Sequence, residues 1–545
     1  MTLLTSTIGE LLEEKVKERP NHEAVVYPER DLRWTYKEFD DRVNETAKAF
    51  MGLGIEKGEH IAIWADNKPE WVLSQFATGK MGAVLVTVNT SYQAAELEYL
   101  LNQSDATTII LAESFKGTSY VDIINEVAPE LKDSEPGQLD CKNVPKLKRV
   151  IVLNEEGAPG CYTWDELMEK ANNVSDDELT QRKESLHHDD VINMQYTSGT
   201  TGFPKGVMLT HSNIVNNGKQ VADGMNLTGE DRLCVPVPLF HCFGCVMSTL
   251  ATVSKGGTMV MIEQYNPEVV LQAVQDEKCT ALNGVPTMFI GELNHPEFEQ
   301  FDLSSLRTGI MAGSNCPVDV MNDVIHKMGA SEITICYGQT ETSPVFTQTR
   351  PTDSIDRRTT TVGKAHPNVE VKITEPGSNR TLPPNEPGEI CTRGYHIMAG
   401  YYKNEEETRA TIDEDGWLHT GDIGMMDEDG YLQVTGRMKD MVIRGGENIY
   451  PREIEEFLIT HPDVVDVQVV GVPDPKYGEE LMAWMIPKEN THVTEEDIRA
   501  FCKGKISHHK IPKYIEFTDE YPMTASGKVQ KYRLREKAQD LLQLD

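Results

Sequence analysis

Short apolar segments alternate with helical stretches through most of the chain, and this alternation constrains the fold more than any other feature. The early apolar segments are 60–64, 84–88, 108–111 and 149–152, with helical patterns between them. The alternation resumes at Val191 and runs again from Arg232 to about Tyr337. Such a rhythm is typical of a layered α/β sheet. We therefore predict a large α/β domain in this part of the chain.

The pattern changes after residue 361, where short strand-like segments are separated by turn pairs such as Pro376-Gly377 and Asp429-Gly430. This pattern predicts a smaller β-rich unit. The last segment, 441–545, has its own strand over 464–472 and a helix over 494–503 that begins at a Thr/Glu cap. We predict an α/β protein with an N-terminal domain over 1–438, in which about 361–436 form a β-rich subdomain, and a small α+β C-terminal domain over 439–545.

The charge of the chain excludes a class of partners. Lys and Arg number 52 against 87 Asp and Glu, which gives a net charge of −35 and a sequence pI near 4.8. A surface with this field repels polyphosphate, and the sequence has no long Lys/Arg run. We expect no nucleic-acid partner. Salt adaptation and plain solubility both remain as explanations of the acidic excess.

Cysteine usage and hydropathy bear on the compartment. The ten cysteines show no disulfide spacing, which suits a reducing environment. Cys242 and Cys245 form one CxxC pair, a weak zinc signal without a second pair. No run approaches the ~20 apolar residues of a membrane span, and the N-terminal segment is too acidic for a transit peptide. We expect a cytoplasmic protein without a membrane span.

The strongest local signal is residues 196–206, which read Tyr-Thr-Ser-Gly-Thr-Thr-Gly-Phe-Pro-Lys-Gly. Glycine lets backbone amides turn inward, hydroxyl groups add donors and Lys205 adds positive charge, so the segment can cradle a polyphosphate. It differs from a Walker A motif because a strand over 207–210 follows and no helix begins before about Ser212. A plain surface turn is the alternative interpretation.

This segment strongly resembles the phosphate loop of the adenylate-forming superfamily, which includes acyl-CoA synthetases, peptide-synthetase adenylation domains and firefly luciferase. Five further segments resemble family motifs in the same order along the chain: 336–342, 395–402, 420–423, 436–440 and 522–528. The stretches 444–451 and 501–512 look closest to the medium-chain branch called acyl-CoA synthetase family member 2. The resemblance covers nearly the whole chain.

The resemblance implies that ATP binds along several of these motifs. On the phosphate loop, the resemblance implies a catalytic role for Thr197. It also implies ATP-binding roles for Ser198, Gly199, Thr200, Thr201, Gly202 and Lys205. Around the adenine it implies stacking on Tyr337, with Gly338, Gln339 and Thr340 following and Gly313, Ser314 and Asn315 on the other side. Tyr337 could instead be an ordinary core residue.

Three charged residues complete the implied nucleotide site. Glu341 would hold Mg²⁺, which takes one or two carboxylates and keeps several waters. Asp422 would accept hydrogen bonds from both ribose hydroxyls, because a carboxylate has two acceptor oxygens. Arg437 would lie near the ribose and phosphate. The alternatives are a helix-start acid for Glu341, a plain turn for Asp422 and an interdomain ion pair for Arg437.

The resemblance implies that the C-terminal domain contributes to two successive reactions, formation of an acyl adenylate and formation of the thioester. The domain would have to move between them. Lys528 would neutralise the attacking carboxylate and the α-phosphate, although alone it would be a solvated lysine. Gly445 and Gly446 would line the tunnel for the pantetheine of coenzyme A. Lys439 matches the family's hinge position, and a solvated linker lysine is its alternative interpretation.

The acyl site is marked less sharply. His241, in the segment 238–244, matches the family's aromatic gate, while a satisfied core histidine is its alternative. Met247, Met311 and Val345 would line an apolar tunnel or belong to the ordinary core. An amino acid substrate would need a carboxylate just before the gate, and Asp231 lies too far upstream.

Together these residues predict an ATP-dependent acyl-CoA ligase that converts a medium-chain fatty acid to acyl-CoA, with AMP and pyrophosphate as products. ATP, Mg²⁺ and coenzyme A are its expected cofactors, and a homodimer stays open as its assembly. Two alternatives remain: an enzyme that loads an activated acid onto a carrier protein, and a nucleotide-binding regulator without activity.

Overall fold

The computed structural model describes residues 2–197, 204–314, 316–444, 447–488, 491–503, 505–506, 508–524 and 529–543. The predicted site residues 198–202, Asn315, Gly445, Gly446 and Lys528 lie outside these ranges. The chain divides into two compact units. The first comprises Met1–Glu370 and Arg393–Leu418, and the second Val371–Thr392 and His419–Asp545. The β-rich sheet therefore groups with the C-terminal segment, and the predicted boundary at 438/439 stays a prediction.

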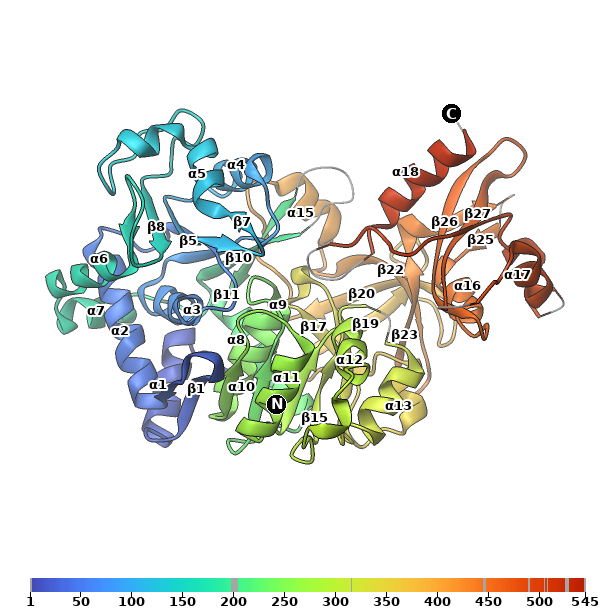
Figure 1. Ribbon diagram of the computed structural model, residues 1–545, viewed down its shortest axis with the longest axis horizontal. Coiled ribbons are helices and arrows are strands. Elements are labelled where there is room, and N and C mark those ends of the chain that lie inside the picture. The colour runs from blue at the N-terminus through green and yellow to red at the C-terminus, as the bar shows by residue number, and fades with distance from the viewer. Residues whose placement is uncertain are drawn as a thin grey trace. The chain divides into compact units, whose positions relative to one another are not determined.

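Two large sheets form the framework of the first unit (Figure 1). The nine-stranded sheet has the order β18 (Lys364–Ala365), β17 (Val345–Gln348), β16 (Thr334–Gly338), β15 (Thr308–Met311), β14 (Ala281–Gly284), β12 (Arg232–Val235), β13 (Thr258–Met261), β1 (Glu23–Tyr27), β2 (Leu32–Thr35). The eight-stranded sheet has the order β21 (Gly400–Tyr401), β11 (Lys205–Thr210), β10 (Val191–Thr197), β4 (Val84–Thr87), β3 (His60–Trp64), β5 (Thr108–Ala112), β8 (Arg149–Leu153), β9 (Tyr162–Thr163). A separate hairpin pairs β6 (Ser114–Phe115) with β7 (Thr118–Ser119).

Helices cover these sheets. They are α1 (Ile8–Glu18), α2 (Tyr36–Gly52), α3 (Pro69–Met81), α4 (Ala94–Gln103), α5 (Tyr120–Val127), α6 (Trp164–Glu169), α7 (Asp176–Glu184), α8 (His211–Gly224), α9 (Cys242–Gly244), α10 (Ala251–Lys255), α11 (Pro267–Glu277), α12 (Pro286–Leu293), α13 (Val318–His326), α14 (Ile355–Thr360) and α15 (Glu405–Thr411). One apolar cluster joins strands of both sheets to α2, α3 and α8, through residues such as Val25, Val86, Phe39, Phe76 and Ile214. No helix in the described ranges is long and apolar enough to cross a membrane.

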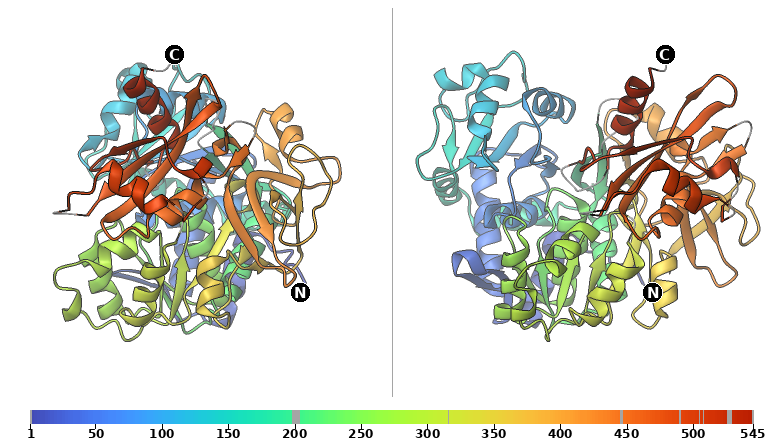
Figure 2. Two further views of the ribbon diagram at one scale, coloured as in Figure 1. Left: turned by 90° about the vertical axis from the view of Figure 1, so that its right-hand side faces the viewer. Right: turned by 45° about the vertical axis from the view of Figure 1, so that its right-hand side comes forward.

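The second unit contains two further sheets. The first has the order β19 (Val369–Thr374), β20 (Gly388–Gly394), β22 (Leu418–Met426), β23 (Leu432–Arg437). The other has the order β25 (Glu447–Ile449), β24 (Val442–Arg444), β27 (Gly478–Pro487), β26 (Val464–Asp474), with β28 (Tyr514–Phe517) parallel to β27. Alternate residues of β27 point to opposite faces, so Leu481 and Ala483 pack with α16 (Pro451–Leu458) and α17 (Glu495–Cys502), whereas Met482 packs with α18 (Lys531–Leu542). Figure 2 shows helices of this unit on both sides of the sheet.

The α/β alternation is confirmed, and most of its strands lie where they are predicted. The segment 60–64 is β3, and the other early segments differ from β4, β5 and β8 by one residue at most. Apart from a short strand over 24–27, the pattern of residues 7–51 predicts helix. This is wrong for 32–35, which form the edge strand β2, in which only Trp34 is buried. A strand predicted over 417–418 is found at Leu418 but runs on to Met426, where glycines and polar residues hide the strand period.

A buried carboxyl without a full set of partners gives a stability prediction. Glu292 of α12 is 1% exposed, its Oε2 has no hydrogen-bond partner among the described residues, and burial raises its pKa well above the usual value. Since the folded state then binds a proton more tightly than the unfolded state, the free energy of unfolding falls as pH rises from the unfolded pKa, ~4.3, toward the folded one. Glu292→Gln removes this loss.

We expect Glu292→Gln to gain stability relative to the wild type as pH rises, by up to ~1.4 kcal/mol per pH unit within that window. Urea unfolding at about pH 5.5 and about pH 8 measures it. Glu299→Gln, at an exposed carboxylate on the segment that follows α12, is the control. An identical pH dependence for Glu292→Gln and the wild type would contradict the prediction.

Candidate functional site

The two strands that flank the predicted phosphate loop in the sequence pair with each other. β10 and β11 are antiparallel, and Thr197 at the end of β10 lies opposite Lys205 at the start of β11. Lys205 Nζ lies 2.5 Å from Oε1 of Glu407 on α15 and 4.5 Å from the centroid of the Tyr401 ring. The lysine therefore has a carboxylate counter-ion and an aromatic face beside it.

Two other predicted motifs converge on this hairpin. β21 pairs with β11, so Tyr401 lies opposite Val207. The Tyr401 hydroxyl donates to Glu341 Oε1 at 2.9 Å, and the Met398 amide donates to the Glu341 carbonyl at 3.0 Å. Burial, followed by the nearby Glu341 charge, raises the pKa of Tyr401, so the phenol stays a donor. The motifs 196–206, 336–342 and 395–402 thus meet within the first unit.

The segment that carries Glu341 folds back tightly on itself. It lies in the short 3₁₀ helix Thr340–Thr342, after β16. A Cβ on Gly338 would lie 1.7 Å from the Pro344 carbonyl oxygen, so only glycine fits there. The Gln339 amide donates to that oxygen at 2.9 Å. The Tyr337 ring packs edge-on against Phe346, 5.0 Å between centroids.

The donor set at Glu341 fits a magnesium ligand. Its carboxylate is partly exposed, and its Oε1 accepts a hydrogen bond from the Tyr401 hydroxyl. Mg²⁺ takes one or two carboxylates together with substrate phosphates. Gly313 and Ser314, predicted beside the adenine, follow β15 and are exposed.

A second cluster forms in the second unit around Asp422. In the β22–β23 ladder, Asp422 lies opposite Arg437, with Arg437 Nε 3.5 Å from Asp422 Oδ1. The Asp422 side chain is 8% exposed, whereas that of Arg437 is 51% exposed. The sheet therefore brings together two residues that the sequence predicts separately for the ribose. Lys439 is exposed in the 3₁₀ turn Met438–Asp440 that follows β23.

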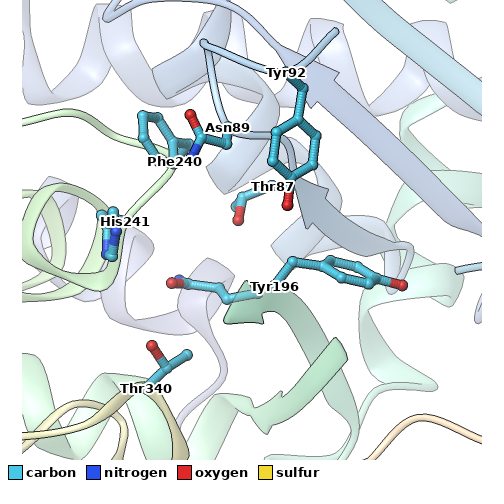
Figure 3. Close-up of a pocket in the computed structure, with 8 residues that line it drawn as sticks. Thr87, Asn89, Tyr92, Tyr196, Phe240, His241 and Thr340 are labelled. Carbon is cyan, nitrogen blue, oxygen red and sulfur yellow. The ribbon is translucent and has the colours of Figure 1, made fainter. Parts of the chain in front are cut away.

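The predicted gate His241 lines a pocket in the first unit (Figure 3). The other lining residues are Thr87, Asn89, Tyr92, Gln195, Tyr196, Phe240 and Thr340. His241 and Thr340 are both predicted, for the acyl and nucleotide sites. Sequence reasoning misses Thr87 and Asn89, although Thr87 ends the parallel strand β4, and ligands of α/β sheets bind at the carboxyl ends of strands.

The other predicted acyl residues lie in the core. Met247, Met311 and Val345 are all buried, and none of them lines the described pocket. Met247 and Val345 belong to the apolar cluster shared by the two sheets, whereas Met311 belongs to a different cluster. The structure does not place these three side chains in the pocket of His241, and their acyl role stays a prediction.

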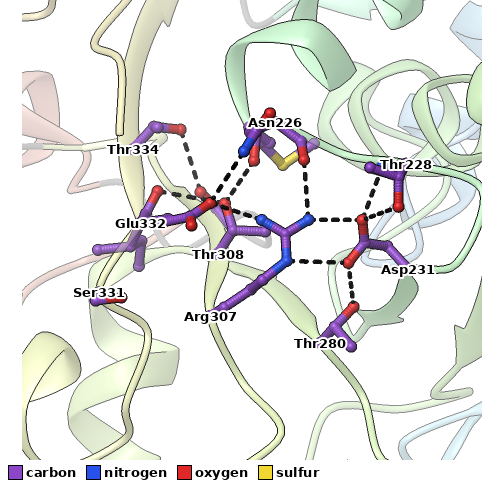
Figure 4. Close-up of polar contacts among 12 residues, drawn as sticks. Asn226, Thr228, Asp231, Thr280, Arg307, Thr308, Ser331, Glu332 and Thr334 are labelled. Carbon is purple, nitrogen blue, oxygen red and sulfur yellow. Dashed lines mark hydrogen bonds and ion pairs between the residues drawn. The ribbon is translucent and has the colours of Figure 1, made fainter. Parts of the chain in front are cut away.

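Asp231 is engaged in an internal network (Figure 4). Its carboxylate accepts hydrogen bonds from Arg307 Nη2 and from Thr280 Oγ1, both at 2.6 Å, and from the Thr228 amide at 2.7 Å. Burial alone would raise the pKa of Asp231, but the hydrogen bonds from Thr280 and Arg307 hold it below its usual value. This carboxylate serves the fold, which agrees with its exclusion as an amine ligand.

Known proteins resemble this chain over its whole length. The "Putative acyl-CoA synthetase YngI" of Bacillus subtilis (strain 168) is 58% identical over 542 residues, which cover 99% of each chain. The medium-chain acyl-CoA ligase ACSF2, mitochondrial, of Danio rerio is 41% identical over 99% of this chain and 90% of its own.

Solved structures of other proteins share the fold of this chain. The crystal structure of ATP-bound MatB from Rhodopseudomonas palustris matches with a TM-score of 0.85 at 27% identity, covering 99% of this chain and 100% of MatB. The anthranilate CoA ligase AuaEII in complex with anthranoyl-AMP matches with 0.86 at 28% identity, covering 100% and 99%. The family model "AMP-binding enzyme" matches residues 12–402, and "AMP-binding enzyme C-terminal domain" matches 453–528. The chain therefore belongs to the family of AMP-binding enzymes.

Proposed function

We propose that this AMP-forming acyl-CoA ligase activates a medium-chain fatty acid in two steps. The observation that carries the proposal is the convergence of the phosphate hairpin, Glu341 and Tyr401 in one place, beside the pocket of His241 and Thr340. The acyl-CoA synthetases among the relatives support the same reaction class.

In the first step, a carboxylate oxygen of the acid attacks the α-phosphorus of ATP, and pyrophosphate leaves. Negative charge accumulates where two anions meet, so cations and donors must be in place before the reaction. Lys528 would neutralise the carboxylate and the α-phosphate, and Lys205 would exchange Glu407 for a phosphate oxygen. Mg²⁺, when bound, would neutralise phosphate charge, and Glu341 would hold it.

In the second step, the thiolate sulfur of coenzyme A attacks the acyl carbonyl. The bond between that carbon and the phosphate oxygen breaks, and AMP leaves with the electron pair. Gly445 and Gly446 would leave room for the pantetheine arm, since glycine has no side chain. Asp422 and Arg437 would hold the ribose through both steps.

The pocket composition supports an uncharged acyl chain. Among its lining residues there is no carboxylate to pair with an amine, and no Lys or Arg to pair with a second carboxylate. Asp231 is occupied by Arg307 and Thr280. Buried charges need partners, so this lining disfavours an acid that carries a second charged group.

Pyrophosphate exchange across linear acids of two to eighteen carbons, with aromatic acids and amino acids beside them, tests this substrate class. We expect a maximum at medium chain length. A best rate with acetate, benzoate or an amino acid would overturn the assignment.

A cytoplasmic location is part of the proposal. All ten cysteines are buried free thiols, which suits a reducing compartment. The expected absence of a nucleic-acid partner and the homodimer stay predictions.

A further inference from the structure

Glu389 on β20 makes two hydrogen bonds to the segment that carries Asp422. Its Oε1 accepts from the Gly421 amide at 3.2 Å, and its Oε2 accepts from His419 Nδ1 at 2.9 Å. Glu389 is only 6% exposed. Because an ionised carboxylate can only accept hydrogen bonds, both contacts require donors on this part of β22. A buried side chain outside the predicted nucleotide motifs thus binds β22 at two residues that precede Asp422.

Other hydrogen bonds fix the same part of β22. Thr420 Oγ1 donates to the Ile390 carbonyl at 2.7 Å and accepts from the Asp422 amide at 3.1 Å. Gly421 has φ +69°, a conformation that residues with a side chain rarely adopt, and its amide points to Glu389 as a result. The carboxylate of Glu389 therefore stabilises the backbone conformation from which Asp422 directly continues.

A metal site is the competing explanation of this cluster. Donor atoms of Glu389, Cys391 and His419 lie within 4.8 Å of one another. Direct contacts account for that proximity, since His419 Nδ1 lies 2.9 Å from Glu389 Oε2 and 3.4 Å from Cys391 Sγ. Structural zinc sites have four protein ligands, and this group supplies three. The cluster is therefore a hydrogen-bonded support.

We propose that Glu389, assisted by His419, is a positioning residue that sets the Asp422 carboxylate for two simultaneous hydrogen bonds to the ribose hydroxyls. The proposal rests on the ribose role of Asp422 in the proposed function. Glu389 would not touch the nucleotide. Its loss should weaken the recognition of the hydroxyls more than the binding of the rest of ATP.

Equilibrium binding of ATP, 2′-deoxy-ATP and 3′-deoxy-ATP to the full chain tests this role without any acid substrate. The wild type should bind ATP at least about tenfold more tightly than either deoxy analogue, which is the scale of one lost hydrogen bond. Glu389→Gln keeps the size but faces His419 with an amide, so ATP should bind about tenfold more weakly while the analogues change little. The variant then no longer prefers ATP over the two deoxy analogues.

Two further variants keep the test decisive if Glu389→Gln folds poorly. His419→Asn retains a donor near Oε2 and should retain the preference, whereas His419→Leu should lose it. Glu386→Gln, at an exposed residue just before β20, is the control. An equal loss for all three nucleotides in Glu389→Gln, or a retained preference in His419→Leu, would overturn the positioning role.

If the wild type itself shows no preference, the ribose role of Asp422 fails, and this proposal fails with it. A wild type that discriminates among the nucleotides but activates no acid refutes only the proposed function.

Discussion

Lys528→Ala is expected to abolish acyl-adenylate formation while thioester formation from a supplied acyl adenylate stays nearly intact. The ammonium would act where charge develops, as the carboxylate approaches the α-phosphate, and the second step has no such encounter of two anions. Removing one preorganised electrostatic contact costs ~3 to 4 kcal/mol, or about 10²- to 10³-fold in rate.

The two half-reactions are measured separately, the first by pyrophosphate exchange and the second by acyl-CoA release from synthetic acyl adenylate. Lys537→Ala, at an exposed lysine of α18, should leave both rates unchanged. Equal loss of both half-reactions in Lys528→Ala would show that the lysine supports the fold of the C-terminal domain or both reactions alike.

Lys439→Pro is expected to separate the same two steps in another way. Lys528 would serve adenylation and the Gly445-Gly446 pair thioester formation, so the small domain would have to rotate between the steps. A hinge works when one or two residues absorb a large change in φ and ψ. Lys439 lies in a 3₁₀ turn, whose φ near −60° is compatible with proline, and proline then locks φ near −65°.

We expect Lys439→Pro to retain pyrophosphate exchange within about tenfold, ~1.4 kcal/mol, and to lose most acyl-CoA formation. Lys439→Ala removes the same charge without fixing φ, so it should retain both activities. Acyl-CoA formation at the wild-type rate in the proline variant would place the pivot elsewhere or exclude the two-conformation mechanism.

The sequence predicts the buried strands well and the exposed ones poorly. β3 and β5 are covered on both faces, so their residues are nearly all apolar and stand out. β2 is an edge strand with one buried side chain, and β22 contains Thr420, Gly421 and Asp422, so neither has a strong apolar pattern. Burial, more than strand propensity, made segments recognisable.

In the candidate site, the local motifs can be predicted from the sequence, whereas the contacts between them cannot. Its motifs are recognisable one by one, because each has an unusual local composition. The contacts between them are not, since Lys205 and Glu407 are 202 residues apart and Tyr401 and Glu341 are 60 apart. The role of Glu389 cannot be predicted from the sequence, because a lone glutamate has no pattern around it and its partners become visible only in the folded sheet.

The transfer of a labelled oxygen tests the central claim, that the acid is activated as an acyl adenylate. A medium-chain fatty acid with oxygen-18 in both carboxyl positions is incubated with ATP, Mg²⁺, coenzyme A and the enzyme, and the products are examined by mass spectrometry. One carboxyl oxygen attacks phosphorus and leaves with AMP when the thiol attacks the carbon. The account predicts one labelled oxygen in AMP and one in the thioester. Label in a free phosphate together with ADP, or no label in any nucleotide product, would contradict it.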